Sequence, residues 1–145
     1  MNNDLQDFEQ FMKRREKAAQ AYVSGDTAPL SRISAQVLPA TFFSPKGDYR
    51  QGTDEVSSTY EYDATNFEPG GDTSFEILQM AASNGIAYWV GFQRANARMR
   101  GSSEAIPMNL RVTEVFRREG NEWKLVHRHA DFLKIESESS KSSSA

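Results

Sequence analysis

Residues 110–132, LRVTEVFRREGNEWKLVHRHADF, decide the fold of this chain. β-Branched and aromatic residues occupy both halves, and Glu119-Gly120-Asn121-Glu122 lies where the chain must reverse, so the stretch predicts a β-hairpin. Because side chains alternate along a strand, one face of the second arm should carry Trp123, Leu125, His127, His129 and Asp131. The other face should carry Lys124, Val126, Arg128, Ala130 and Phe132. The first face is typical of a pocket wall, apolar at its floor and polar at its mouth.

The 145 residues are enough for one domain with a single core, which we expect to span residues 1–134. A net charge of −3 gives no global attraction to nucleic acid or to an anionic membrane, so neither is expected as a partner. The lack of cysteine excludes disulfides and thiolate metal sites. The N-terminus carries acids where a signal peptide needs a basic start, so we expect a soluble cytoplasmic protein. Residues 135–145 are almost free of apolar side chains and should form a disordered polar tail.

Apolar residues at helical spacing predict a helix from Asp4 to Ser24, and Thr27 can cap a second, shorter helix. A third helix should run from Thr53 to about Tyr62. Loops are expected at residues 66–72 and 101–107, and strands before the hairpin at residues 40–44, 49–51, 74–82 and 86–98. Three helices followed by a long antiparallel meander predict an α+β fold. The helices should cover one face of a curved sheet and leave a conical hollow.

The segments AYWVGFQ (87–93) and RVTEVFRREGNEWKLVHRHADF (111–132) resemble the nuclear transport factor 2-like superfamily, the SnoaL-like and ketosteroid-isomerase-like group. Within that group the hairpin looks most like the association domain of calcium/calmodulin-dependent protein kinase II. The resemblance implies a cone-shaped fold, a homodimer formed through the sheet, and a hollow used either as an active site or as a binding pocket. The fold alone does not choose between these uses.

Residue by residue, the resemblance departs from the known enzymes. Ketosteroid isomerases carry an Asp-Pro after the first strand, where this chain has Ser44-Pro45, and a hydroxyl cannot take up a proton near neutral pH. The family's helix-one tyrosine falls on Lys17, which leaves Tyr22 out of register, and only Glu114 matches the acid of the penultimate strand. The pocket arginines of the association domain fall on Val90 and Glu114. Both known arrangements are therefore disfavoured.

The candidates for proton transfer are His129, His127 and Glu114. An imidazole titrates near neutrality, and Asp131 could set its tautomer. Glu114 among aromatic neighbours should have a raised pKa through desolvation, or else it pairs with a histidine or an arginine and is structural. Two histidines and one carboxylate would fit a metal triad in composition. Same-face neighbours on a strand stand about 6.5–7 Å apart, however, so we expect no metal. The sequence contains no glycine-rich phosphate loop or dinucleotide fingerprint, so we expect no cofactor.

Aromatic and aliphatic side chains on the strands are candidates for contact with a ring-shaped ligand, although such residues are also common in plain cores. The predicted ligand-binding residues are Tyr88, Val90, Phe92, Phe116, Tyr49 and Asp131. Alternation places Tyr88, Val90 and Phe92 on one face of the strand expected at residues 86–98. The sequence therefore predicts a protein that binds a partly apolar small molecule, with cofactor-independent isomerase, cyclase or hydratase activity as its catalytic form. Non-catalytic ligand binding and an oligomerisation module are the alternatives.

Overall fold

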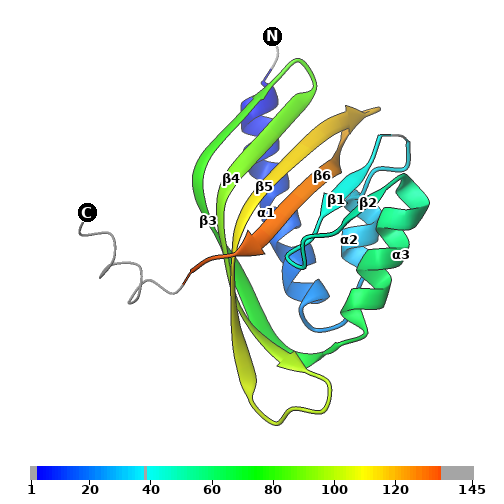
Figure 1. Ribbon diagram of the computed structural model, residues 1–145. Helices are drawn as coiled ribbons and strands as arrows, with labels where there is room; N and C mark the ends of the chain where they lie inside the picture. The colour runs from blue at the N-terminus through cyan, green and yellow to red at the C-terminus, as the bar shows by residue number, and fades with distance from the viewer. Residues whose placement is uncertain (1–2, 38, 135–145) are drawn as a thin grey trace.

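The computed structural model describes residues 3–37 and 39–134 (Figure 1), so the tail predicted at residues 135–145 lies outside the described residues. The described residues form three helices, α1 (Asp4–Tyr22), α2 (Ala28–Ile33) and α3 (Thr53–Ala64). They also form six strands: β1 (Thr41–Phe43), β2 (Tyr49–Gln51), β3 (Phe67–Ser83), β4 (Ile86–Met99), β5 (Ala105–Glu119) and β6 (Glu122–Phe132). None of these helices has the length and apolar character needed to cross a membrane.

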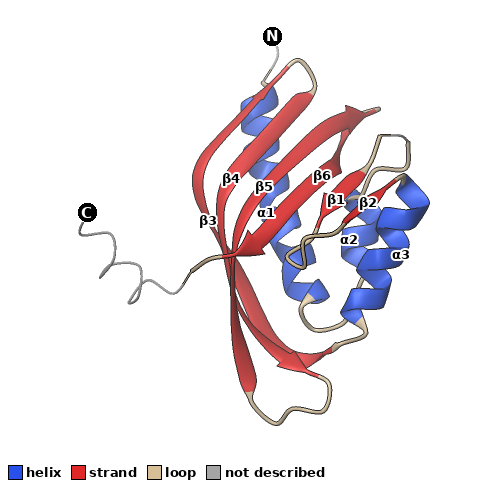
Figure 2. Cartoon of the chain, in the orientation of Figure 1, coloured by secondary structure: helices blue, strands red, loops and turns tan. Residues whose placement is uncertain are grey.

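The strands build one curved sheet in the order β2-β1-β6-β5-β4-β3, with the helices on one side of it (Figure 2). The core lies between α1 and the inner face of the sheet. Phe8 of α1 packs its ring against Phe116 and Trp123, with centroid separations of 5.1 and 5.5 Å. The predicted α+β plan, with a helical layer on a curved sheet, is confirmed.

The predicted hairpin forms between β5 and β6, but a β-bulge interrupts its second arm. Phe116 pairs with Leu125, whereas Val115 pairs with His127, so Val126 is an extra residue with no partner in the register. Leu125 and Val126 are both buried. Because an extra residue reverses the side-chain alternation beyond it, the face that begins with Trp123 and Leu125 does not continue through His127. The predicted single face from Trp123 to Asp131 is wrong.

Two other features differ from the prediction. The loop expected at residues 66–72 is largely part of β3, where a register shift between Glu68 and Asp72 accommodates Pro69-Gly70-Gly71 within the strand. The short strand β1 pairs in parallel with β6, so the sheet is not a pure meander. This parallel pairing brings the chain after α2 back beside the hairpin, and it places the β1–β2 turn at the edge of the inner face.

Candidate functional site

A cavity of about 240 Å³ lies on the inner side of the sheet, beside the second half of α1. Its lining comes from all three helices, from β1 and the β1–β2 turn, and from β3, β4, β5 and β6, and most of the lining surface is apolar. The apolar lining includes Ala19, Leu30, Phe42, Phe67, Met108 and Leu110. Polar side chains also reach the cavity, and two of them are arginines, Arg15 and Arg128.

The two arginines meet on the buried carboxylate of Glu114. Arg15 donates from Nε to Oε1 at 2.9 Å and from Nη2 to Oε2 at 2.7 Å. Arg128 donates from Nη1 to Oε2 at 2.6 Å, and the indole of Trp89 donates to Oε1 at 2.8 Å. Glu114 is completely buried, Arg15 is 3% exposed and Arg128 is 12% exposed. Sequence-distant residues of α1, β4, β5 and β6 are thus tied at one point, which we call the Glu114 cluster (Arg15, Trp89, Glu114 and Arg128).

The ionisation of Glu114 is decided by its two partners. Burial by itself would raise the pKa of Glu114, but the charges and hydrogen bonds of Arg15 and Arg128 outweigh burial and lower it to about 2. The predicted raised pKa is therefore wrong, and the alternative of pairing with arginine holds. Two guanidinium groups face one carboxylate, so the Glu114 cluster carries one net positive charge at neutral pH.

This positive charge is not fully satisfied by the protein. Within the described residues, Nη1 of Arg15 is buried and has no hydrogen-bond partner. Arg128 is held by a relay instead: its Nη2 donates to Oε1 of Gln93 at 2.8 Å, and Nε2 of Gln93 donates to Oγ1 of Thr73 at 3.2 Å. A buried donor that lacks an acceptor costs free energy. The cluster is consequently able to receive an anionic oxygen at low cost.

Two tyrosines, Tyr22 and Tyr60, line the same cavity. Burial is the main cause that raises the pKa of both hydroxyls far above the ordinary value. Their rings lie 6.3 Å apart in an edge-on arrangement. Both hydroxyls remain protonated near neutral pH, so they can donate a hydrogen bond to a ligand.

This architecture matches a known protein family. The model of the SnoaL-like domain matches residues 13–133, most of the chain. The chain belongs to the SnoaL-like domain family. Among curated proteins, no sequence matches it.

Several solved structures share the fold of this SnoaL-like domain at low sequence identity. A candidate dehydratase of the nuclear transport factor 2-like family from Streptomyces avermitilis is 20% identical, with 90% of this chain and 98% of that chain covered at a TM-score of 0.72. A nuclear transport factor 2-like protein from Salmonella enterica is 13% identical, with coverages of 90% and 91% at a TM-score of 0.74. A candidate calcium/calmodulin-dependent protein kinase type II association domain from Thiobacillus denitrificans is 17% identical, with coverages of 81% and 88% at a TM-score of 0.63. The resemblance to this superfamily is confirmed, and at these identities the likeness shows the fold alone.

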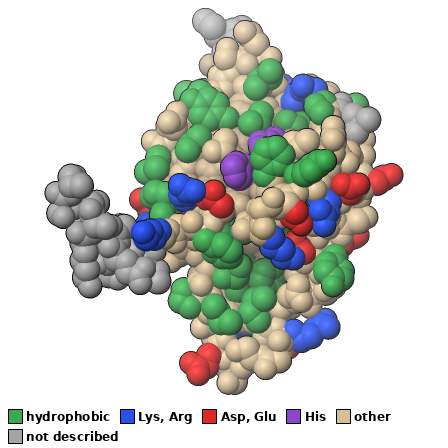
Figure 3. Space-filling model, viewed as in Figure 1, with side chains coloured by type: hydrophobic (Ala, Val, Ile, Leu, Met, Phe, Trp, Pro, Cys, Tyr) green, Lys and Arg blue, Asp and Glu red, His purple; other side chains and the backbone are tan. Residues whose placement is uncertain are grey.

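The SnoaL-like domain places His127, His129 and Asp131 on the outer face of the sheet, away from the cavity. Nδ1 of His127 lies 2.7 Å from Oγ1 of Thr41, and the Phe43 ring packs edge-on against both imidazoles, at 4.8 and 5.5 Å. The histidine side chains are visible on the viewed face, beside hydrophobic side chains (Figure 3). The predicted position of these imidazoles on the pocket wall is wrong because the bulge at Val126 turns them outward. The two imidazoles do not line the cavity, and their catalytic role stays a prediction.

Asp131 has a different partner from the one predicted. It accepts two hydrogen bonds from Arg111, at 2.7 and 2.8 Å, and lies 3.8 Å from Nε2 of His129. The hydrogen bond from Arg111 is the main cause that lowers the pKa of Asp131. Burial, and then the charge of His129, lowers the pKa of His127. Within the described residues, no group of three metal-ligating side chains is close enough to hold an ion.

The other predicted ligand-binding residues also lie outside the cavity lining. On β4, the inward positions belong to Ala87 and Trp89, so the alternating residues Tyr88, Val90 and Phe92 face outward. The Tyr88 hydroxyl donates to Gln79 at 3.0 Å. Tyr49 is 64% exposed, and Phe116 is inside but packed solidly against α1. The shared face on β4 was predicted correctly, but its side of the sheet was not.

Sequence reasoning missed Arg15, Arg128 and Asp63, which line the cavity, and it set Tyr22 aside. Arg15 carried a usable signal. It lies seven positions after Phe8, on the apolar stripe of α1 that also includes Met12 and Ala19, and a charged side chain there must be buried and paired. No such sequence signal marks Arg128, because its inward direction depends on the β-bulge at Val126.

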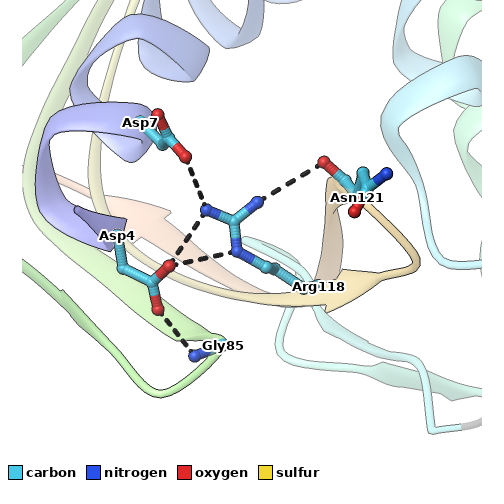
Figure 4. Close-up of a pocket in the computed structure, with 5 residues that line it drawn as sticks. All are labelled: Asp4, Asp7, Gly85, Arg118 and Asn121. Atoms are coloured by element: carbon cyan, nitrogen blue, oxygen red, sulfur yellow. Dashed lines mark hydrogen bonds and ion pairs between the residues drawn. The ribbon is translucent and has the colours of Figure 1, made fainter. Parts of the chain in front are cut away.

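A second hollow lies at the opposite end of α1 and is strongly polar (Figure 4). Arg118 donates to Asp4 at 3.0 Å, to Asp7 at 2.9 Å and to the backbone oxygen of Asn121 at 3.4 Å. Asp4 also accepts from the backbone N–H of Gly85 at 2.8 Å. These contacts join the start of α1 to the β3–β4 and β5–β6 turns. Because its groups satisfy one another, this hollow is a structural clamp, and the cavity is the better candidate site.

Proposed function

We propose that this SnoaL-like domain binds a small, largely apolar molecule that carries one carboxylate or other anionic oxygen. Arg15 and Arg128 would hold the anionic group, and the apolar walls of the cavity would hold the remainder. The observation that carries the proposal is the net positive charge of the buried Glu114 cluster, with one donor of Arg15 left without an acceptor. An incoming anion would supply that acceptor and neutralise the charge where water is scarce.

The size of the cavity supports a small ligand. Its volume of about 240 Å³ lies just below the range of about 300–1,000 Å³ typical of pockets for drug-sized molecules. One ring with a short acidic side chain is therefore an appropriate size. The two tyrosine hydroxyls would add donors for the same ligand.

Binding without catalysis is the form that this geometry supports best. The imidazoles predicted to transfer protons face the outside of the sheet. Glu114 is held ionised by two guanidinium groups, so it would not accept a proton near neutral pH. Cofactor-independent isomerase, cyclase or hydratase activity would therefore have to use other groups.

The proposal is tested with a matched pair of probes, phenylpropionate and its neutral amide. We expect the wild-type protein to bind the acid at least about tenfold more tightly, since hydrogen bonds to charged groups contribute about 1.5–3 kcal/mol. Arg128→Met should remove this preference, because Glu114 keeps Arg15 and Trp89 as partners while the cluster loses its excess charge. Arg100→Met, at an exposed position outside the cavity, should keep it.

Isothermal titration calorimetry measures both affinities, and amide chemical shifts map where the probe binds. Equal affinity for acid and amide in the wild-type protein would overturn the proposal. So would a preference for the acid that survives in Arg128→Met.

A further inference from the structure

Asp63 lies where the cavity joins a second pocket. That pocket has a volume of about 250 Å³ and is formed by the β1–β2 hairpin and α3. Three residues, Ser44, Lys46 and Asp63, belong to the lining of both pockets. The junction is therefore a second polar part of the cavity lining. It differs from the Glu114 cluster because it carries a carboxylate where the cluster carries excess guanidinium charge.

The carboxylate of Asp63 occupies a position that does not stabilise the fold. It lies in the last turn of α3, where the helix dipole disfavours a negative charge. It is partly buried, and within the described residues its side chain makes no hydrogen bond or ion pair. Burial is the main cause that raises its pKa; Lys46 and Arg50 act in the opposite direction and Asp48 in the same direction. A poorly solvated, unpaired acid at a cavity mouth is a frequent feature of functional sites.

The neighbouring charged groups do not supply a partner. Asp48 pairs with Arg50 at 3.4 Å and accepts a hydrogen bond from Ser44. Arg50 also donates to Thr59 at 3.1 Å. Among the described residues, the ammonium group of Lys46 makes no hydrogen bond or ion pair either. The junction therefore offers one unused acceptor and one unused donor.

We infer that Asp63 and Lys46 select ligands with a hydroxyl group at the end opposite the acid, so that the ligand class is a hydroxy acid with an apolar middle. This inference rests on the proposed function, because the acid end must be held by Arg15 and Arg128. A hydroxyl group both donates and accepts, so it can donate to the carboxylate of Asp63 and accept from Lys46. A charged ligand group would gain from only one of them: Asp63 would attract an ammonium group that Lys46 repels, and Lys46 would attract a carboxylate that Asp63 repels.

Three pairs of probes test the inference: benzoate, phenylacetate and phenylpropionate, each against its para-hydroxy derivative. The series varies the spacing between acid and hydroxyl. In the wild-type protein the hydroxyl should raise the affinity of at least one pair about fivefold or more, as expected for a hydrogen bond to a charged group. In Asp63→Ala that gain should fall to within about twofold, while the affinity for the unhydroxylated acid is kept.

Glu61→Ala is the matched control, since Glu61 is an exposed acid on the same helix and lies outside the cavity lining. It should keep the full hydroxyl gain. Asp63→Ala should fold normally, because it removes an unfavourable charge from the end of α3. A hydroxyl gain absent from all three pairs, or unchanged in Asp63→Ala, would overturn this inference and leave the acid site standing. Failure of every acid to bind would overturn the proposed function and this inference together.

Discussion

Replacing Glu114 with glutamine should cost the protein a large part of its stability. In the native state, Oε1 accepts from Arg15 and Trp89, and Oε2 accepts from Arg15 and Arg128. A glutamine amide is a donor on one side, so it would face a guanidinium N–H with another N–H and leave two buried positive charges without a counter-ion. Removing one partner of a buried ion pair typically costs about 3–5 kcal/mol.

The pKa of Glu114 gives an independent magnitude and a sign. It falls from 4.5 to about 2 on folding, and one pKa unit corresponds to about 1.4 kcal/mol, so ionised Glu114 contributes about 3 kcal/mol. Because the folded-state pKa is the lower one, this contribution is complete above pH 4.5 and is lost as the pH falls toward 2. The free energy of unfolding of wild-type protein should decrease over this window, and the difference from Glu114→Gln should narrow.

Urea denaturation at a series of pH values from 7 to 3, followed by tryptophan fluorescence, measures both effects. Thermal unfolding at pH 7 should give Glu114→Gln a melting temperature about 10–15 °C lower than that of the wild-type protein. Glu104→Gln, an exposed acid just before β5, is the control and should change stability by less than about 0.5 kcal/mol. A loss below about 1 kcal/mol in Glu114→Gln, or a difference that does not depend on pH, would refute the reasoning.

Two further predictions concern the outer face and the clamp. We expect a homodimer through the outer face of the sheet, and Phe43→Asp should make the protein a monomer on light scattering, because Phe43 is an exposed ring that packs against both imidazoles. A monomeric wild-type protein would contradict this prediction, and a large ring would favour an association-domain-like assembly. Asp4→Ala should lower the free energy of unfolding by about 1–3 kcal/mol and speed hydrogen exchange at the Gly85 amide, since Asp4 accepts hydrogen bonds from Gly85 and Arg118. An unchanged exchange rate at Gly85 would contradict the role of this cluster as a structural clamp.

Much of the fold follows from local patterns. The apolar spacing of α1 and the reversal at Gly120 are local signals, and both elements form as predicted. Alternation on β4 correctly groups Tyr88, Val90 and Phe92, because a regular strand preserves its period of two. Alternation cannot tell which side of the sheet α1 will cover, so the same group was placed inside when it lies outside.

The candidate site depended on a single inserted residue. Up to Leu125 the alternation on β6 is as expected, and beyond Val126 it is reversed, so that Arg128 points to Glu114 while the imidazoles point outward. Bulges are set by pairing with neighbouring strands, here β5 on one side and the parallel strand β1 on the other. No local pattern in the stretch from Trp123 to Phe132 distinguishes a bulged strand from a regular one.

The amino-acid sequence by itself determined the α+β plan and the hairpin, because these follow from hydrophobic periodicity and turn chemistry within short segments. Its similarity to known sequences indicated the family. Only the tertiary structure decided which charges meet. Arg15 and Glu114 are separated by 99 positions in the chain, and their pairing exists because α1 crosses the inner face of a sheet whose bulge turns Arg128 toward the same carboxylate. Contacts between distant segments set the charge of the cavity, and with it the kind of ligand that the cavity can hold.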